Sequence, residues 1–165
     1  MTALLAVEQV NAYFGNKQVL FDVNLTVAAG QKVAIVGESG SGKTVLAQGI
    51  MRLNPDVRLT GNIRYQEQDL LAMPEKQLAK IRGRDIGMVF QEPMTALNPV
   101  YTVGNQIAEI YTQHLGLTRK QAWQAAINIL RETGIQDAAN KVKAYPFQLS
   151  GGQRQRAMIA MAVAA

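Results

Sequence analysis

The sequence contains no cysteine and only one histidine, His114, among its 165 residues. The lack of cysteine excludes disulfide bonds, thiolate zinc sites and cysteine-ligated iron–sulfur clusters. A single histidine excludes a metal site built from several histidines of this chain. No apolar run approaches the roughly 20 residues needed to span a bilayer, and the N-terminus lacks the basic start and long apolar region of a signal peptide. We therefore expect a soluble cytosolic chain that meets a membrane only through a partner.

Charge is also sparse, at 18% of residues, with 17 basic and 12 acidic side chains and a net charge of +5. Most of the excess lies in residues 93–165, which hold seven basic and three acidic side chains. Because these charges are scattered and form no basic run, we expect no nucleic-acid partner. The 48% of hydrophobic residues provides enough material for one core.

The first part of the chain has the composition of strands. Residues 4–14 and 19–27 flank Gly15-Asn16 and predict a hairpin. A turn is expected at 28–31 and a further strand over 59–66. Short apolar runs predict two more strands, buried on both faces, at 32–36 and 86–90.

Helical signals follow. Helices are expected over 43–53, stopped by Asn54-Pro55, and over 74–82, with Pro74 in its first turn. Two amphipathic helices are expected in an insert around 100–135, with Gly134 ending the second, and a last helix follows Ser150. The apolar faces of the two insert helices carry these residues: Val103, Ile107, Ile110, Tyr111, His114; Trp123, Ala126, Ile127, Leu130.

Residues 37–44 match the pattern G-x-x-x-x-G-K-[ST] directly after a predicted strand and before a predicted helix. Glycines let the backbone curl so that successive N–H groups converge on phosphate oxygens, and the helix dipole favours the same anion. Lys43 would place its ammonium between the β- and γ-phosphates, and the Thr44 hydroxyl would be a ligand of Mg²⁺. The pattern predicts a site for a nucleoside triphosphate.

A second helix start has similar properties. Ser150 and Gln153 form a capping-box pattern, and Gly151 and Gly152 leave backbone amides uncovered between them. A helix N-terminus without bulky side chains favours an anion. The chain thus offers two phosphate-binding helix ends far apart in sequence.

The chain resembles the ATPase subunit of an ABC transporter at four places in the right order. These are residues 37–44, the Q-loop-like Phe90-Gln91-Glu92-Pro93, the signature-like Leu149-Ser150-Gly151-Gly152-Gln153-Arg154-Gln155-Arg156, and the aromatic pair Tyr13-Phe14. The resemblance implies an α/β P-loop NTPase fold of the ABC ATPase type, with an N-terminal antiparallel β region and an α-helical insert.

The resemblance also assigns roles. Gln91 would be the γ-phosphate sensor, reaching Mg²⁺ or the attacking water. The family's aromatic residue usually precedes a glycine, so Phe14, before Gly15, would stack on adenine in preference to Tyr13. Adjacent strand residues face opposite ways, so only one of the two should contact the base. In the family the two helix ends grip one ATP only when two subunits meet head to tail. The expected nucleotide-binding residues are Tyr13, Phe14, Gly37, Glu38, Ser39, Gly40, Ser41, Gly42, Lys43, Thr44, Gln91, Ser150, Gly151, Gly152 and Gln153; Lys43 and Gln91 would be catalytic, and Thr44 and Gln91 would bind Mg²⁺.

Residues 89–99 are similar to the Q-loop of importer ATPases for dipeptides, oligopeptides and nickel. Residues 145–148 also resemble that group, although Phe147 stands where histidine is more frequent. The resemblance implies the energy-coupling, ATP-binding subunit of an importer, acting with a second ATPase subunit and with membrane permease subunits. Such a subunit lies on the cytoplasmic face of the inner membrane, and residues 94–115 would receive the permease.

Other residues have simpler interpretations. Glu92 follows an apolar strand, but its position before the signature matches a Q-loop rather than a catalytic base. We expect His114 to have a packing role, and Trp123 to lie in the core or at an interface. Packing is also expected for Met158, Ile159 and Met161.

The chain ends at Ala165, within the signature helix, before the family's Walker B strand, D-loop and switch histidine. The expected divisions are 1–92 (β-rich and P-loop core), 93–150 (Q-loop exit and helical subdomain) and 151–165 (signature helix), with an incomplete core sheet. Since a general base is worth about 10²–10⁴-fold, this chain alone is expected to hydrolyse ATP poorly.

Two alternatives remain open. One is a soluble ABC-type ATPase acting on nucleic acid or ribosomes, which a coiled coil or a second cassette would favour. The 57 residues between Gln91 and Leu149 contain no such coiled coil. The other is a catalytically silent nucleotide-binding fragment.

Overall fold

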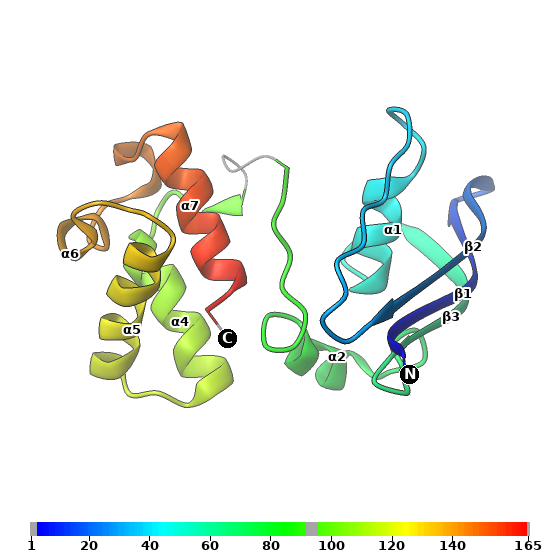
Figure 1. The fold of residues 1–165 in the computed structure, drawn as a ribbon, viewed down its shortest axis with the longest axis horizontal. Helices are drawn as coiled ribbons and strands as arrows, with labels where there is room; N and C mark the ends of the chain where they lie inside the picture. Colours follow the sequence, from blue (N-terminus) through cyan, green and yellow to red (C-terminus); the bar gives the residue numbers. More distant parts are fainter. Residues whose placement is uncertain (1–2, 92–95, 165) are drawn as a thin grey trace. The chain divides into compact units, whose positions relative to one another are not determined.

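The computed structural model describes residues 3–91 and 96–164. It divides into two compact units, one ending at Leu78 and the other beginning at Ala79 (Figure 1). The functional divisions at residues 92 and 150 stay a prediction from the sequence.

The first unit is built on an antiparallel sheet. β1 (Ala3–Phe14) and β2 (Lys17–Ala28) form the hairpin predicted around Gly15-Asn16. β3 (Val57–Tyr65) pairs with the other edge of β1, and the short β4 (Gln68–Asp69) follows, so the strand order is β2-β1-β3-β4.

The register gives this sheet two distinct faces near the hairpin turn. Ala12 pairs with Leu20 on β2 and with Leu59 on β3, and paired residues point to the same side. Gln18 donates to Asn11 Oδ1 over 2.7 Å, which places these two neighbours on the opposite side. We call the two sides the helix face (Ala12, Phe14, Lys17, Leu20, Val57, Leu59) and the outer face (Asn11, Tyr13, Gln18, Arg58).

Helix α1 (Lys43–Ile50) packs on the helix face. Its Leu46 is buried, and a β-carbon on Gly49 would lie 3.3 Å from Leu59 Cδ1. The helix is shorter than the predicted 43–53 because Arg52 takes a positive φ of 48°. The Arg52 guanidinium then donates to the carbonyl oxygens of Leu70 and Met73, at 3.1 and 2.6 Å, and so ties this end of α1 to the loop before α2 (Glu75–Ile81).

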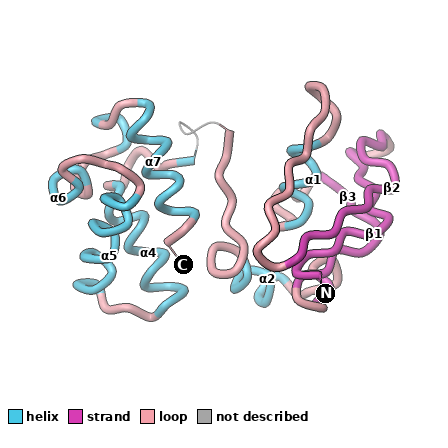
Figure 2. The backbone as a smooth tube through the Cα atoms, in the orientation of Figure 1, coloured by secondary structure: helices cyan, strands magenta, loops and turns pink. Residues whose placement is uncertain are grey.

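Two predicted strands are wrong in this structure. Residues 32–36 have no regular structure (Figure 2), and Val36 is 89% exposed. In 86–90 only one isolated bridge forms, between Arg82 and Ile86. Both runs have the composition of doubly buried strands, but among the described residues neither has the neighbouring strands that such burial requires.

The second unit is helical, as the periodicity predicts. It contains α4 (Val103–Leu115), α5 (Arg119–Glu132), the short α6 (Ala138–Lys141), a 3₁₀ turn at Pro146–Gln148 and α7 (Gly151–Ala162).

Threonine side chains start the two longer helices. Thr102 accepts from the Asn105 backbone, and Thr118 forms a capping box with Gln121. Glycines with positive φ, Gly116 and Gly134, follow α4 and α5.

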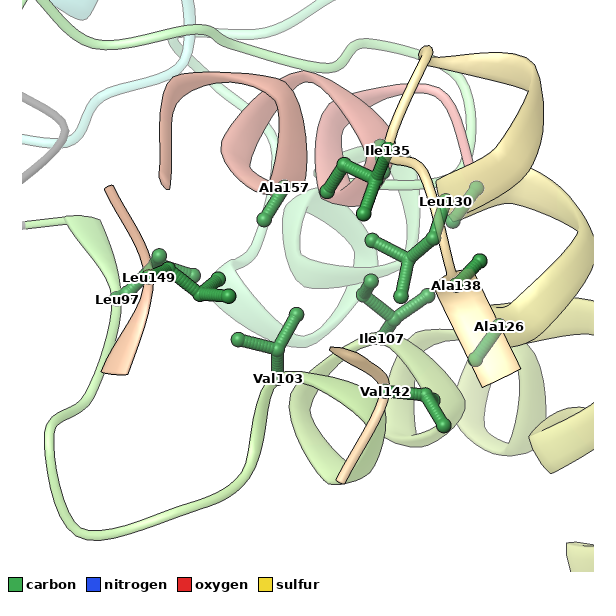
Figure 3. Packing of buried hydrophobic residues seen from close by; sticks show 12 residues of the cluster. Leu97, Val103, Ile107, Ala126, Leu130, Ile135, Ala138, Val142, Leu149 and Ala157 are labelled. Atoms are coloured by element: carbon green, nitrogen blue, oxygen red, sulfur yellow. The ribbon is translucent and has the colours of Figure 1, made fainter. Parts of the chain in front are cut away.

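The apolar faces of these helices meet in one core (Figure 3). Val103 and Ile107 from α4 pack with Ala126 and Leu130 from α5, and Ala157 joins them from α7. All five side chains are fully buried. Burying a side chain such as Ile107 or Leu130 contributes about 1.5–3 kcal/mol, so this core holds α7 against the two helices of the insert.

Helix α4 begins at a close approach of two backbones. The Gly104 N–H donates to the Val142 carbonyl over 2.8 Å, and a β-carbon on Gly104 would lie 2.3 Å from Val142 Cγ2 and 2.9 Å from Trp123 Cη2. Trp123 is partly buried and packs against the core of the helical unit. His114 is half-buried against Gly83, in agreement with its predicted packing role.

Candidate functional site

Three glycines shape the loop between β2 and α1. Gly40 and Gly42 have φ values of +84° and +86°, which favour glycine. A β-carbon on Gly42 would lie 2.5 Å from Leu20 Cδ2, and one on Gly37 would lie 2.7 Å from Ser41 Oγ. The loop therefore curls tightly, and Gly42 sits directly against the helix face of the sheet.

The Lys43 side chain lies inside the curled loop and binds its oxygen atoms. Its ammonium donates to the carbonyl oxygens of Gly37 and Glu38, at 2.9 and 2.7 Å, and to Ser41 Oγ at 3.1 Å. Three loop oxygens thus gather around one cation. Anionic phosphate oxygens would compete well for the same donor, because their negative charge attracts the ammonium more strongly than neutral carbonyl and hydroxyl oxygens do.

The start of α1 leaves its backbone donors uncovered. Gly42 is the N-cap residue and contributes no side chain, and no acidic residue lies in the first turn. The first N–H groups of a helix need acceptors, and the positive end of the helix dipole lies at the same place. Thr44, in this first turn, is exposed. The arrangement suits a phosphate group, with a hydroxyl beside it.

Tyr13 and Phe14 differ in their surroundings. The Arg58 guanidinium covers the Tyr13 ring at 4.2 Å from its centroid, on the outer face. Phe14 is 38% exposed and lies on the helix face, the side on which Gly42 contacts Leu20. Of the two aromatic rings, Phe14 is thus the one on the P-loop side of the sheet.

The second glycine-bearing helix start forms the predicted capping box. Ser150 Oγ accepts from the Gln153 N–H at 3.3 Å, and Gln153 Oε1 accepts from the Ser150 N–H at 3.0 Å. Gly151 and Gly152 are exposed, and a β-carbon on either would meet nothing within 4 Å. No described residue therefore covers the tip of α7 beside these two glycines.

Arg156 fixes α7 to the end of α5. Its guanidinium donates to the carbonyl oxygen of Gly134, the residue with φ +83° that follows α5. A β-carbon on Gly134 would lie 3.1 Å from Arg156 Nη1. The direction of the Ser150 tip is thus tied to the helical insert.

Gln91 is described and exposed. Of the Q-loop-like residues 89–99, those at 92–95 lie outside the described residues. The P-loop and the aromatic pair belong to the first compact unit, whereas Gln91 and the tip of α7 belong to the second.

A groove of about 1130 Å³ lies between α4 and α5, and Tyr101, Glu109, Thr112, Trp123 and Gln124 are among its lining residues. Gln106 holds the loop at one edge of this groove, residues 98–101, in place. The buried Gln106 amide accepts from the Asn98 N–H at 2.8 Å and donates to the carbonyl oxygens of Asn98 and Tyr101, at 2.9 and 3.1 Å.

One ionisable group of the helical unit is clearly perturbed. Burial raises the pKa of the Tyr111 phenol above its ordinary value of 10.0, and the Glu132 carboxylate raises it further. Both effects disfavour the phenolate.

A metal site made only of protein carboxylates and imidazole is absent from the described part of the chain, where no cluster of three or more such side chains occurs. The predicted Mg²⁺ ligands are instead the Thr44 hydroxyl and the Gln91 amide. Hard oxygen donors of this kind suit an ion that takes its remaining ligands from phosphate and water. The described residues also include no helix long and apolar enough to cross a membrane.

Three contacts were not anticipated from the sequence. They are Arg58 over Tyr13, Leu20 under Gly42, and the Gln106 bonds to residues 98–101. The first follows from the cross-strand register, which could be found once the hairpin and β3 were aligned. The other two depend on tertiary packing.

Comparison with known proteins identifies the family. The ABC transporter family matches residues 20–165. A protein of Brucella abortus (strain 2308) named "Putative peptide import ATP-binding protein" is 50% identical over 152 residues, covering 86% of this chain and 44% of that protein. The "Peptidoglycan transport ATP-binding protein YejF" of Agrobacterium fabrum is 45% identical over 168 residues, covering 98% of this chain and 31% of that protein. The chain thus spans less than half the length of these relatives.

Solved structures agree with the fold. The ATP-binding cassette MJ0796, in a dimeric post-hydrolysis state bound to ADP and phosphate, matches with a TM-score of 0.83 and 28% identity. The match covers 97% of this chain and 69% of that chain. It confirms the predicted ABC ATPase fold with its antiparallel β region and helices, in which the described residues leave the core sheet incomplete. The chain belongs to the ABC transporter family.

Proposed function

We propose that this chain is the nucleotide-binding part of an ATPase subunit that powers an importer for peptides or a related small solute. The observation that carries the proposal is the P-loop, where Lys43 is held by three loop oxygens beside an uncapped helix start. The Brucella relative is named for peptide import and the Agrobacterium relative for peptidoglycan transport. These names support peptides or peptide-containing compounds as the class of solute.

In the proposed role, residues 37–44 bind the phosphates of ATP. Lys43 exchanges its loop acceptors for β- and γ-phosphate oxygens, and the N–H groups at the start of α1 donate to the same phosphates. Phe14 stacks on the adenine ring from the helix face, while Arg58 occupies the Tyr13 ring on the other face.

Thr44 and Gln91 are the proposed Mg²⁺ ligands. The bound ion would neutralise charge on the phosphates and polarise them toward attack by water. Gln91 orients the attacking water through its amide. Hydrolysis is a property that we propose for the complete protein, to which the rest of the longer sequence contributes.

The tip of α7 is the proposed binding site for the γ-phosphate of a partner subunit's ATP. Ser150 and the amides of Gly151 and Gly152 would donate to that phosphate, because no side chain covers them. The dimeric state of the MJ0796 cassette supports an assembly of two ATPase subunits. A homodimer and a pair with a related chain would both provide this arrangement.

The proposed membrane partners are permease subunits. The groove between α4 and α5 is the surface of the helical unit that we propose to receive a permease segment. Tyr101 and Trp123 provide aromatic surface among its polar lining residues, and Gln106 holds the loop at one edge in place. The ATPase would then work at the cytoplasmic face of the inner membrane.

Measurement of ATP binding and hydrolysis by the complete protein tests the proposal. The unmodified protein should bind ATP in the presence of Mg²⁺ and hydrolyse it, and Lys43→Ala should abolish hydrolysis while the protein stays folded. Unchanged hydrolysis by the Lys43→Ala variant would refute the proposed role of the P-loop.

A further inference from the structure

Lys17 is exposed at the hairpin turn, directly opposite Phe14 in the β1–β2 register. Among the described residues no carboxylate pairs with its ammonium. An exposed lysine is by itself ordinary. Whether Lys17 can bind a ligand depends on its position relative to the P-loop.

The sheet places Lys17 on the helix face. Tyr13 pairs with Gln18, and the Gln18 side chain binds Asn11, so these three residues share the outer face. Phe14 and Lys17 form the next pair and therefore point to the other side.

The same face meets the phosphate loop further along β2. Leu20 lies against Gly42, whose β-carbon position is 2.5 Å from Leu20 Cδ2. Lys17 and Leu20 are three residues apart and share this face because the register shifts between them, where Ala12 pairs with Leu20 but Tyr13 pairs with Gln18. Their separation along the strand is at most about 10 Å. An extended lysine side chain is long enough to span much of that distance, so the Lys17 ammonium can approach the loop from beside Phe14.

We infer that Lys17 is a further nucleotide-binding residue, whose ammonium binds the phosphate nearest the ribose. This inference rests on the proposed function, which puts the base on Phe14 and the outer phosphates on residues 37–44. The ribose and the first phosphate then lie between these two points, above the stretch of β2 that begins with Lys17. Of the groups in that part of a nucleotide, only the phosphate carries the negative charge that an ammonium recognises.

Affinity measurements on the complete protein with ATP, AMP and adenosine test this inference. Lys17→Met keeps the apolar stem and removes the charge. It should weaken binding of ATP and AMP by a similar factor, about fivefold, and leave adenosine binding unchanged. Lys17→Arg should keep most of the affinity for ATP.

Arg58→Met is the matched control, because it removes the same charge from the outer face of the same sheet. It should leave ATP affinity within error of the unmodified protein. An unchanged ATP affinity in Lys17→Met would overturn the inference, and so would equal losses in the two variants, since these would indicate a long-range charge effect. Thermal unfolding of each variant shows whether it is folded.

The two proposals fail in different ways. If Lys43→Ala and Phe14→Ala weaken ATP binding but Lys17→Met does not, the inference about Lys17 is wrong and the proposed function stands. If none of the three substitutions alters ATP binding, the nucleotide site itself is misplaced.

Discussion

Gly42 lies against Leu20 so closely that a β-carbon on the glycine would come within 2.5 Å of Leu20 Cδ2 and 3.3 Å of the Val19 carbonyl oxygen. Leu20 is itself buried, so it has little room to move away. This contact joins the phosphate loop to the sheet that carries Phe14, and it makes the loop sensitive to a single methyl group.

Gly42→Ala should therefore weaken ATP binding much more than Gly40→Ala. Both residues have positive φ, and alanine there costs about 1 kcal/mol or more in either case. A β-carbon on Gly40 meets nothing within 4 Å, whereas one on Gly42 also meets Leu20. ATP affinity and thermal unfolding of both variants check this expectation. Equal effects of the two substitutions would show that the packing against Leu20 is unimportant.

Ser150→Ala removes the hydroxyl that accepts from the Gln153 N–H. Loss of an N-cap side chain costs about 1 kcal/mol in the free energy of unfolding, which denaturant titration can measure.

Gly152→Ala tests the proposed phosphate site at the tip of α7 separately. A β-carbon there meets nothing within the chain, so stability should hold.

ATP-driven activity of the complete Gly152→Ala protein should nevertheless fall, because the added methyl group lies where we place the partner's phosphate. A Gly152→Ala protein with full activity and normal stability would argue against a ligand at this tip.

Much of this organisation could be predicted from the sequence because it depends on neighbours along the chain. The Ser150–Gln153 capping box and the hairpin at Gly15-Asn16 are local, and both form as predicted. Phe14 and Tyr13 also follow the alternation of a strand. The position of Arg58 over the Tyr13 ring, however, can be predicted only when the register of β3 is known.

The predictions that were wrong or missing concern contacts between residues far apart in the sequence. Val33, Ile35 and Val36 have the composition of a buried strand, but a strand forms only with a partner, and none of the described residues pairs with them. Gln106 reads as an ordinary polar position on α4, yet its amide is buried because residues 98–101 fold back over it. Local sequence does not predict that a loop will fold back over a polar side chain in this way.

Stability of the helical unit should fall at alkaline pH through Tyr111. Its pKa is raised above 10.0 in the folded chain, by burial and then by Glu132. Once the pH exceeds the ordinary value, the unfolded chain loses this proton while the folded chain keeps it, so the free energy of unfolding decreases as pH rises. Well below pH 10.0 both states keep this proton, and the group does not change the free energy of unfolding.

Tyr111→Phe isolates this contribution from the lysines that titrate in the same range. Denaturant unfolding of both proteins at about pH 8 and about pH 11 should show a smaller alkaline loss in the variant. A pH-independent difference between the two proteins would contradict the assignment.

Mixed assemblies of the complete protein test the central claim most directly, namely that the P-loop of one subunit and the α7 tip of another bind one ATP. Lys43→Ala damages the first element and Ser150→Arg the second. A mixed dimer of these two variants keeps one undamaged P-loop facing one undamaged tip, whereas each variant alone keeps none. We predict ATP-dependent association, measured by sedimentation, for the mixture but for neither variant alone. If the mixture stays as monomeric as the separate variants while the unmodified protein dimerises with ATP, the shared site is contradicted.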